Sequence, residues 1–544
     1  MRNSRPATVK RSYGVRVKGQ SKLADRIHIF SPPKQLWVKP RLLFLLLGFL
    51  LSGCATIPED YPRLASTAIK DYPSTTLGRF FVNPVVRHPD ESGFAILRRG
   101  RHAFTTRIAL TELAEKSLDV QYYIWEADAT GRILADRLLR AADRGVRVRV
   151  LVDDINFAGR DAVLASMDAH PNIEIRLFNP FANRNKHFLD FLVDLKRVNH
   201  RMHNKLMVAD NAAAIVGGRN IGDHYFGVAT DANFRDLDIA AVGPVVRDTS
   251  QVFDHFWNGS WAVPIAALVK RPYSGEDMQA AVTTMRERMA EDDYPYPLDQ
   301  DVDTLITELT DIRAGLIWAS GLIVWDEPAD ISRGIREGVM IRRFYEKLAT
   351  LKSELLIESA YFVTRDKAVE TARQLHDRGV RVRVLTNSLA SNDVVAAHAG
   401  HAKRRAELIS AGVELYELRP DAGTVKQRVF SGESKAALHT KTIVLDRQSV
   451  FIGSFNLDPR SGSINTEAGL YVESPELARH VIAYMDEGVL PQNSYRVLMD
   501  DDGELVWITK VDGREVRYHN EPETTFWQRF LSDFIMLLPV EHQL

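Results

Sequence analysis

The stretch "DRGVRVRVL" occurs twice in the chain, at residues 143–151 and again at residues 377–385. An exact repeat of this kind, in a sequence without low-complexity segments, indicates an internal duplication. The repeat begins at the end of a predicted helix, passes through a glycine suited to a helix C-cap, and enters a predicted strand. The duplicated unit therefore includes a helix followed by a strand.

Matching segments extend outward from both copies. Buried strands are predicted ahead of the repeat, in "SLDVQYYIW" from Ser117 and "SELLIESAYFV" from Ser353. A third strand follows each repeat, in "NIEIRLFNP" and "GVELYELRP", and each is ended by proline. Strand, helix, strand, helix, strand predicts right-handed crossovers and a largely parallel sheet. The chain therefore contains two α/β units.

Each unit continues into the same pattern of polar residues. The first contains "MHNKLMVADNAAAIVGGRN" and the second "LHTKTIVLDRQSVFIGSFN". The aligned residues of the first copy are His203, Lys205, Asp210, Gly217 and Asn220. Those of the second copy are His439, Lys441, Asp446, Gly453 and Asn456. Since the spacing is the same in both copies, H-x-K-x(4)-D is a genuine motif that was duplicated with the fold.

The motif is predicted to form a β-hairpin. "KLMVAD" and "AAAIVGG" are two strands joined by the turn pair Asp210-Asn211. His203 and Lys205 are two residues apart on one strand and point to the same face. Asp210, like Asp446 in the second copy, sits in the turn and away from that face. Although both aspartates are counted with the catalytic residues of the motif, we expect them to make turn hydrogen bonds.

Small residues return beside the histidine in this hairpin. Gly217 and Gly218 lack side chains and would leave room there for a substrate phosphate, while Asn220 projects a donor just beyond. The corresponding residues of the second copy are Gly453, Ser454 and Asn456. Two histidines and two lysines would then serve one phosphorus atom, the lysines supplying the charge that a metal supplies elsewhere. We therefore expect no metal and no other cofactor.

The paired motifs resemble those of the phospholipase D superfamily. The likeness covers nearly the whole mature chain, and "VQYYIW", "RMHNK", "VGGRNIGD", "VLTNSLASNDV", "GVELYEL" and "IGSFNLDPRS" are most similar to bacterial cardiolipin synthases of the C type. The resemblance implies two α/β/α sandwich domains in a pseudo-twofold arrangement that share one active site at their interface. It also implies a phosphohistidine mechanism, with His203 as nucleophile and His439 as general acid and base.

Each histidine needs a partner that fixes its tautomer. Counting back eight residues from Pro244 and Pro475 gives Asp236 and Glu467, which we predict to orient the histidines. For Asp236 a surface carboxylate is the alternative, because its spacing from Asn220 differs from that of the second copy. Four further residues could shape the pocket or have ordinary loop roles: His224, Tyr225, Asn392 and Asp393.

The resemblance implies a membrane-associated phosphatidyltransferase that makes cardiolipin from phosphatidylglycerol and a donor phospholipid, possibly phosphatidylethanolamine. Hydrolysis of phospholipids is the first alternative and a nuclease the second, because the superfamily includes both. Nucleic acid is not expected as a partner, since 70 basic residues balance 71 acidic ones. The single-motif nucleases dimerise to obtain two motifs, whereas this chain carries both.

The only cysteine, Cys54, excludes disulfide scaffolds. It follows an apolar run from Leu42 to Leu51, and the ending "LSGC" resembles a bacterial lipobox, in which the cysteine is lipidated. A buried helix with an incidental cysteine is the alternative. The leader is unusually long, which favours a true start at Val38. We expect a lipid-anchored protein of a bacterial membrane that faces the periplasm.

The predicted domain organisation follows from these segments. Its parts are a leader and signal at 1–53, a linker at 54–95, a first domain at 96–265, a connector at 266–345, a second domain at 346–495 and an extension at 496–544. The extension ends in an amphipathic helix whose apolar stripe contains Trp527, Phe530, Leu531, Phe534, Ile535 and Leu538. That stripe would lie in a lipid interface or pack on the body of the protein.

Overall fold

The computed structural model describes residues 56–58, 60–292, 294–296, 302–328, 337–424 and 434–538, all within the unit Thr56–Leu544. The predicted leader and Cys54 lie outside these residues. Within the described ranges, no helix has both the length and the apolar character needed to cross a membrane.

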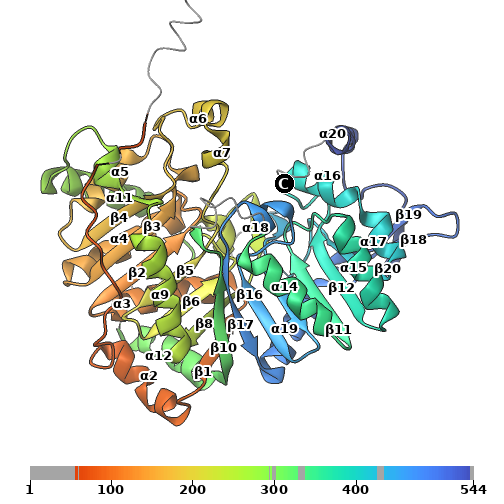
Figure 1. The fold of residues 1–544 in the computed structure, drawn as a ribbon, viewed down its shortest axis with the longest axis horizontal. Coiled ribbons are helices and arrows are strands. Elements are labelled where there is room, and N and C mark those ends of the chain that lie inside the picture. Colours follow the sequence, from red (N-terminus) through yellow and green to blue (C-terminus); the bar gives the residue numbers. More distant parts are fainter. Residues whose placement is uncertain are drawn as a thin grey trace, which may run out of the picture. The chain divides into compact units, whose positions relative to one another are not determined.

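Each predicted α/β unit forms one half of the structure, as Figure 1 shows. The strands of the first half are β1 (Ser92–Leu97), β2 (Ser117–Tyr122), β3 (Arg147–Asp153), β4 (Ile173–Phe178), β5 (Leu206–Ala209), β6 (Ala213–Gly217), β7 (Ala232–Arg235), β8 (Asp238–Val242) and β9 (Ala262–Pro264). Those of the second half are β11 (Glu354–Ser359), β12 (Arg381–Asn387), β13 (Val413–Leu418), β14 (Lys435–Leu438), β15 (Lys441–Leu445), β16 (Ser449–Gly453), β17 (Ala468–Glu473), β18 (Ser494–Met499), β19 (Leu505–Val511) and β20 (Arg514–Tyr518).

The repeated stretch spans the helix-to-strand turn in both halves. Helix α4 (Ala129–Asp143) leads into β3, and α15 (Asp366–Asp377) leads into β12. Gly145 has φ of 94° and Gly379 has φ of 77°, which is the left-handed conformation that ends a helix and favours glycine. The predicted C-cap is therefore confirmed in both copies.

The sheet is mixed, so the prediction of a largely parallel sheet is wrong. The parallel pairs of the main sheet are β2–β3, β3–β4, β11–β12 and β12–β13. The motif hairpin attaches antiparallel to these cores, β5 on β2 and β15 on β11. The crossovers predicted from the sequence hold only for the three strands of each half that helices connect.

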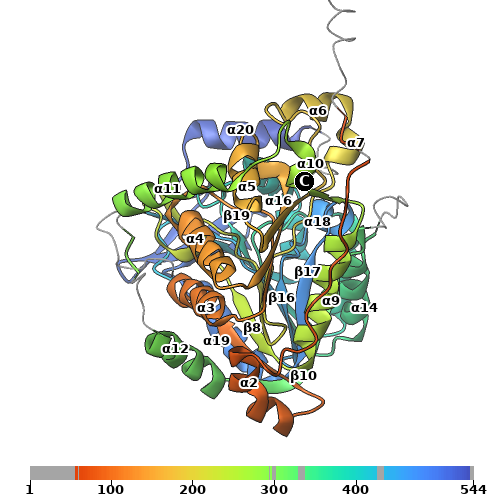
Figure 2. The same cartoon turned by 90° about the vertical axis from the view of Figure 1, so that its left-hand side faces the viewer.

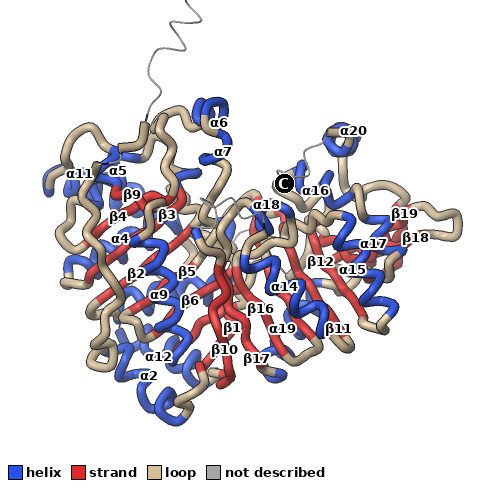
Figure 3. Tube along the Cα trace, in the orientation of Figure 1, coloured by secondary structure: helices blue, strands red, loops and turns tan. Residues whose placement is uncertain are grey.

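One strand joins the two halves into a continuous sheet, which has 18 strands among the described residues and is red in Figure 3. This strand, β10 (Ile317–Trp325), lies in the segment predicted as a connector. Its first residues pair with β1, at Ala319 opposite Ser92, and the rest pair with β17, at Trp325 opposite Ala468. The connector is thus a structural part of both halves.

Helices cover both faces of the sheet in each half (Figures 1 and 2). Those of the first half and the connector are α2 (Thr76–Arg87), α3 (Gly100–Leu113), α5 (Asp161–Asp168), α6 (Phe188–Val193), α7 (Leu195–Val198), α8 (Asp223–Phe226), α9 (Pro244–Asn258), α10 (Ile265–Leu268), α11 (Gly275–Glu291) and α12 (Val302–Ala314), besides α4. Those of the second half are α14 (Val339–Thr350), α16 (Val395–Ala402), α17 (Arg405–Ser410), α18 (Pro459–Ser463), α19 (Pro475–Gly488) and α20 (Phe526–Met536), besides α15.

The core shared by the two halves lies under α9 and α19. A single cluster of buried side chains contains Phe253 and Trp257 of α9, Val481 and Met485 of α19, and residues of both motif hairpins. Burial of a large apolar side chain contributes about 1.5–3 kcal/mol. The halves therefore share a hydrophobic core next to the motifs, which fixes the two histidine segments against each other.

Candidate active site

The first motif histidine lies in a loop that the second half holds in place. The backbone N–H of His203 donates to the carbonyl of Thr466 at 2.8 Å, and Thr466 N–H donates to Arg201 at 3.0 Å. Strand β5 begins only at Leu206, so His203 and Lys205 precede the strand rather than lie on it as predicted. The loop departs from the hairpin because it pairs with the other half.

The second histidine is held by the first half in the same way. His439 N–H donates to the carbonyl of Arg235 at 2.8 Å. The preceding strand β14 pairs in parallel with β7, matching Leu438 to Arg235. Each histidine is therefore positioned by backbone contacts from the opposite half.

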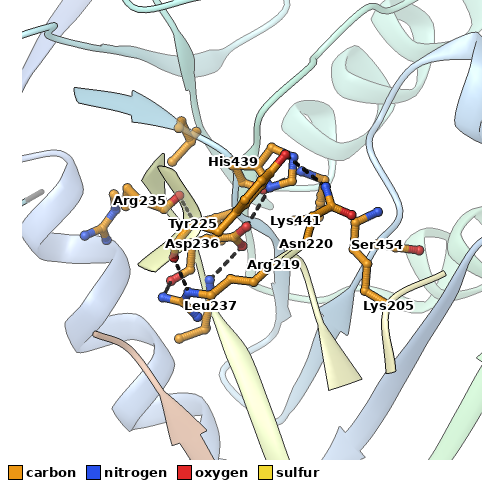
Figure 4. Close-up of polar contacts among 12 residues, drawn as sticks. Lys205, Arg219, Asn220, Tyr225, Arg235, Asp236, Leu237, His439, Lys441 and Ser454 are labelled. Atoms are coloured by element: carbon orange, nitrogen blue, oxygen red, sulfur yellow. Dashed lines mark hydrogen bonds and ion pairs between the residues drawn. The ribbon is translucent and has the colours of Figure 1, made fainter. Parts of the chain in front are cut away.

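Carboxylates are exchanged between the halves as well. His203 Nδ1–H donates to Glu467 Oε2 at 2.9 Å, and His439 Nδ1–H donates to Asp236 Oδ2 at 2.6 Å. Figure 4 shows Asp236 directed at the ring of His439. All four side chains are buried. With Nδ1 occupied, each imidazole presents its Nε2 lone pair as the reactive position.

Two lysines accompany the histidines. Lys205 Nζ donates to the carbonyl of His203 at 2.5 Å, and Lys441 Nζ donates to the carbonyl of His439. Burial lowers the pKa of Lys205 well below its usual value and that of Lys441 to about 8. In their protonated form, these two buried ammonium groups suit a phosphodiester and the extra charge of its transition state.

The surroundings of both histidines disfavour the protonated imidazole. Burial, followed by the positive charges of Lys205 and Lys441, lowers the pKa of His203 and of His439 well below the usual range. A bound phosphate anion would oppose the lysine charges and raise both pKa values. A histidine is therefore protonated more readily once the substrate is bound.

Burial raises the pKa of the orienting carboxyls. Glu467 reaches about 7, and Asp236 is also raised. Asp326, directly after β10, lies behind Glu467: it accepts the Glu467 N–H at 3.1 Å and its own N–H donates to the Glu467 carbonyl at 2.9 Å. The connector thus supports the site.

The motif aspartates lie in the hairpin turns and bind backbone amides. Asp210 accepts N–H groups of Glu115, Lys116 and Ser117 at 2.8–2.9 Å. Asp446 accepts the equivalent amides of the second half, those of Lys352, Ser353 and Glu354. Both aspartates tie the motif hairpin to the start of the neighbouring strand.

The glycines do not hold space for a phosphate, so the reason predicted for them is wrong. A Cβ atom on Gly218 would lie 2.2 Å from Asp236 Oδ1, and one on Gly217 would lie 2.1 Å from Asp238 Oδ1. In the second copy a Cβ atom on Gly453 would lie 2.5 Å from Ala468 O, and the Ser454 hydroxyl donates to Glu467. Protein groups, including the carboxylates that hold the histidines, occupy this space.

The motif asparagines and the four pocket candidates differ in their contacts. Tyr225 contacts a histidine of the site, and the hydrogen bonds of the others are to neighbouring groups. Asn220 accepts Ile124 N–H at 3.1 Å and donates to the Tyr225 hydroxyl at 3.0 Å, whereas Asn456 is simply buried. The Tyr225 ring lies edge-on to His439 at 5.1 Å. The other three candidates are His224, which donates to the Ala232 carbonyl, Asn392, which accepts Val394 N–H, and Asp393, which accepts the Tyr361 hydroxyl.

Several residues at the site were not predicted from the sequence. Tyr123 contacts His203 edge-on at 4.8 Å, and Asp153 fixes the histidine loop by accepting Met202 N–H at 2.7 Å. The position of each at the carboxyl end of a parallel strand, where ligand sites gather, was the available signal. Asp326 gave no such signal, because nothing in the sequence placed the connector in the sheet.

A cluster of three or more His, Cys, Asp or Glu side chains arranged to hold a metal ion does not occur among the described residues. The polar groups that converge on the site are the two imidazoles, the two ammonium groups and the two carboxyls.

Two histidine–carboxylate pairs exchanged between duplicated α/β halves, with a lysine beside each histidine, define a phospholipase D-type active site. Comparison with known proteins agrees. Residues 108–257 and 345–488 match the family described as "Cardiolipin synthase, PLD-like domain". The chain belongs to this cardiolipin synthase family of phospholipase D-like enzymes.

Relatives match over most of their length. The chain is 38% identical to "Cardiolipin synthase C" of Escherichia coli (strain K12), over 84% of this chain and 97% of that protein. It is 30% identical to an uncharacterized protein of Helicobacter pylori (strain J99), over 91% of this chain and 98% of that one. The structure of a phosphatidylserine synthase from Haemophilus influenzae Rd KW20 superposes with a TM-score of 0.50 at 16% identity, covering 77% of this chain and 91% of that one, which indicates a shared fold.

Proposed function

We propose that this phosphatidyltransferase makes cardiolipin, transferring a phosphatidyl group from a donor phospholipid to the terminal hydroxyl of phosphatidylglycerol. The observation that carries the proposal is the crossed arrangement of His203 with Glu467 and His439 with Asp236, at 2.9 and 2.6 Å. It provides two imidazoles with fixed tautomers for one phosphorus atom. The similarity to a cardiolipin synthase along nearly its whole length supports the choice of substrates.

In the first step His203 Nε2 attacks the donor phosphorus and forms a P–N bond. The P–O bond to the headgroup alcohol breaks, and His439 Nε2–H protonates the departing oxygen. The assignment is taken from the family resemblance, and the partners support it: Asp236 accepts the His439 Nδ1–H at 2.6 Å, a short contact that favours a protonated His439. Glu467 divides its carboxylate between His203 and the Ser454 hydroxyl, which suits a neutral nucleophile.

In the second step the neutral His439 takes the proton of the acceptor hydroxyl. The acceptor oxygen attacks phosphorus, and the P–N bond to His203 breaks, so both histidines return to their starting states. Lys205 and Lys441 balance the negative charge that builds on the phosphoryl oxygens in both transition states. Water as the acceptor would give phosphatidic acid, which is the hydrolase alternative.

We further propose phosphatidylethanolamine as one donor, and a lipid anchor at Cys54 that holds the enzyme on the periplasmic side of a bacterial membrane. The support for the lipid anchor is the "LSGC" ending of an apolar run, which resembles a lipobox.

The proposed limits of the two phospholipase D-like domains are 96–265 and 346–495.

The test supplies isotope-labelled phosphatidylglycerol, with and without phosphatidylethanolamine, to the detergent-solubilised full chain. Products are followed by mass spectrometry for wild type, His203→Ala, His439→Ala and, as a control, the exposed His519→Ala. Labelled cardiolipin from wild type and His519→Ala, absent from both other variants, is expected. Histidine-dependent phosphatidic acid without cardiolipin would establish a phospholipase instead.

The two histidine variants also separate the steps. With a phosphatidyl donor whose leaving group is nitrophenol, protonation of the leaving oxygen is unnecessary. His439→Ala is then expected to accumulate an acid-labile phosphoenzyme, and His203→Ala to form none. The reverse result would exchange the two roles.

A further inference from the structure

Exposed apolar side chains gather in two segments of the described surface. Isolated ones are normal on a protein surface, whereas a contiguous group marks an interaction site. Those of the first segment are Phe188, Leu192, Val193 and Leu195 of α6 and α7. Those of the second are Phe526, Trp527, Phe530, Leu531, Phe534, Leu537 and Leu538 of and after α20.

Helix α20 presents its apolar side outward. Trp527 is 73% exposed, whereas Ser532 is buried against the body. The helix packs on α16. The segment ahead of it is anchored by Glu521, which accepts from Arg405 at 2.8 Å and pairs with His398 at 3.0 Å. The predicted stripe therefore does not pack on the protein but is held away from it.

Helices α6 and α7, the first segment, form the other apolar ridge. Leu192 is 77% exposed, and the exposed lysines Lys186 and Lys196 flank the ridge. Two acids lie in the same segment: Asp190 is buried and accepts the N–H groups of Ala182 and Asn183, and Asp194 is paired with Arg197 at its Nε atom. The ridge thus combines apolar side chains with two exposed lysine ammonium groups.

Both ridges lie on the catalytic side of the sheet. Segment α6–α7 follows the carboxyl end of β4 and leads directly into the loop of His203. Helix α16, which carries α20, follows the carboxyl end of β12. Figures 1 and 2, related by a rotation about the vertical axis, both show α6, α7 and α20 at the top and α2 at the bottom.

We propose that α6–α7 and α20 form one docking surface for an anionic phospholipid bilayer, which brings the histidine site to the headgroups. Aromatic and aliphatic side chains on a helix that lies flat suit the interface between headgroups and acyl chains, and the two lysines match an anionic surface. A bilayer surface is extended, so it can contact the α6–α7 ridge and the α20 ridge at the same time. The proposal rests on the proposed function only in that the substrate is a membrane lipid.

The chain has a single cysteine, so replacing it allows a label to be attached at one chosen position. In the full chain carrying Cys54→Ser, one further substitution, Leu192→Cys, Phe530→Cys or the control Val86→Cys, receives an environment-sensitive fluorophore. Val86 is 69% exposed on α2. Vesicles of phosphatidylcholine, with or without phosphatidylglycerol, are then added. We expect a blue shift of emission and quenching by brominated lipid at positions 192 and 530 but not at 86, greater with phosphatidylglycerol.

The other outcomes overturn the proposal. Unchanged emission at 192 and 530 in the presence of vesicles would exclude docking through this surface. A shift that needs no vesicles and grows with protein concentration would identify a second copy of the chain as the occupant. Binding is measured without turnover, so a label that enters the bilayer in a chain that makes no cardiolipin would refute the proposed function alone.

Paired substitutions give a second readout. Phe188→Ser with Leu192→Ser, and Trp527→Ser with Phe530→Ser, are expected to weaken vesicle binding about tenfold or more, since each pair removes two interfacial side chains. Val82→Ser with Val86→Ser is the matched control. Activity on detergent-dispersed substrate should be retained in all three, whereas equal binding by all three would contradict the proposal.

Discussion

Asp236 Oδ2 lies 2.6 Å from Nδ1 of His439, although the first residue belongs to one half of the duplication and the second to the other. The reverse contact joins Glu467 to His203. Neither half can therefore fix the tautomer of its own histidine.

Asp236→Asn is expected to lower kcat by about 10²- to 10⁴-fold, because an amide cannot stabilise the imidazolium that His439 forms. KM should change little, since the lysines that face the phosphate remain. Steady-state kinetics with circular dichroism as a folding check measures this. Asp248→Asn, exposed in the same half, is the control, and an unchanged kcat in Asp236→Asn would remove Asp236 from the mechanism.

The dependence of kcat/KM on pH should be bell-shaped. The pKa of Glu467 is about 7, so activity falls as the pH drops below 7 and Glu467 is protonated and stops accepting from His203. The pKa of Lys441 is about 8 and burial also lowers the pKa of Lys205 well below its usual value, so activity falls again toward alkaline pH as the lysine charges are lost. Lys441→Arg should move the alkaline limb upward, because arginine keeps its charge. An alkaline limb that stays in place would assign it to another group.

Asp210→Asn is expected to lower the free energy of unfolding by about 1–3 kcal/mol while leaving kcat of the folded enzyme nearly unchanged. An amide weakens the charged hydrogen bonds from three backbone N–H groups at the start of β2. Denaturant titration and kinetics on the same samples separate the two effects. A loss of kcat comparable to that of His203→Ala would make Asp210 catalytic.

Gly321→Ala should weaken the strand that joins the halves. The added Cβ would lie 2.5 Å from the ring of the fully buried Phe94, so overpacking of about 1–3 kcal/mol is expected. Thermal unfolding measures it. Gly275→Ala, where a Cβ meets no atom within 4 Å, is the control. Equal melting temperatures would show that the Phe94 ring makes room for the added Cβ without cost.

Glu521→Gln should loosen α20. The amide removes the charge that Arg405 and His398 share with the segment ahead of the helix. Amide hydrogen exchange across Phe526–Met536 is expected to accelerate, whereas Glu515→Gln on the β19–β20 hairpin should leave that exchange unchanged. Unaltered protection of α20 would mean that its packing on α16 is sufficient.

Local features of the sequence predicted much of the site. Repeat spacing located His203 and His439, and the position of Asp236 and Glu467 ahead of a helix-starting proline identified the carboxylates. The exchange between halves could not be predicted, since it depends on how two domains pack. Gly217 and Gly218 were misjudged for a different reason: the carboxylates that fill their space come from β8 and the segment before it in the same half, and no local pattern shows that β8 pairs beside β6.

The role of the connector was also out of reach of local patterns. A strand such as β10 is defined by the partners on its two sides, and these are β1, which comes more than two hundred residues earlier, and β17, which follows much later. The sequence "IWASGLIVW" lacks the strict alternation of apolar and polar residues that marks a half-buried strand.

Strand β10 has a consequence for what each half could be alone. Without it, β1 and β17 would each present a row of unpaired backbone N–H and C=O groups, the kind of border that templates aggregation. Cutting the chain on either side of β10 would leave one half with an unpaired sheet edge and the other with β10 as an additional edge strand. The fused arrangement therefore covers both sheet edges as well as completing the catalytic centre, and halves expressed separately are expected to aggregate.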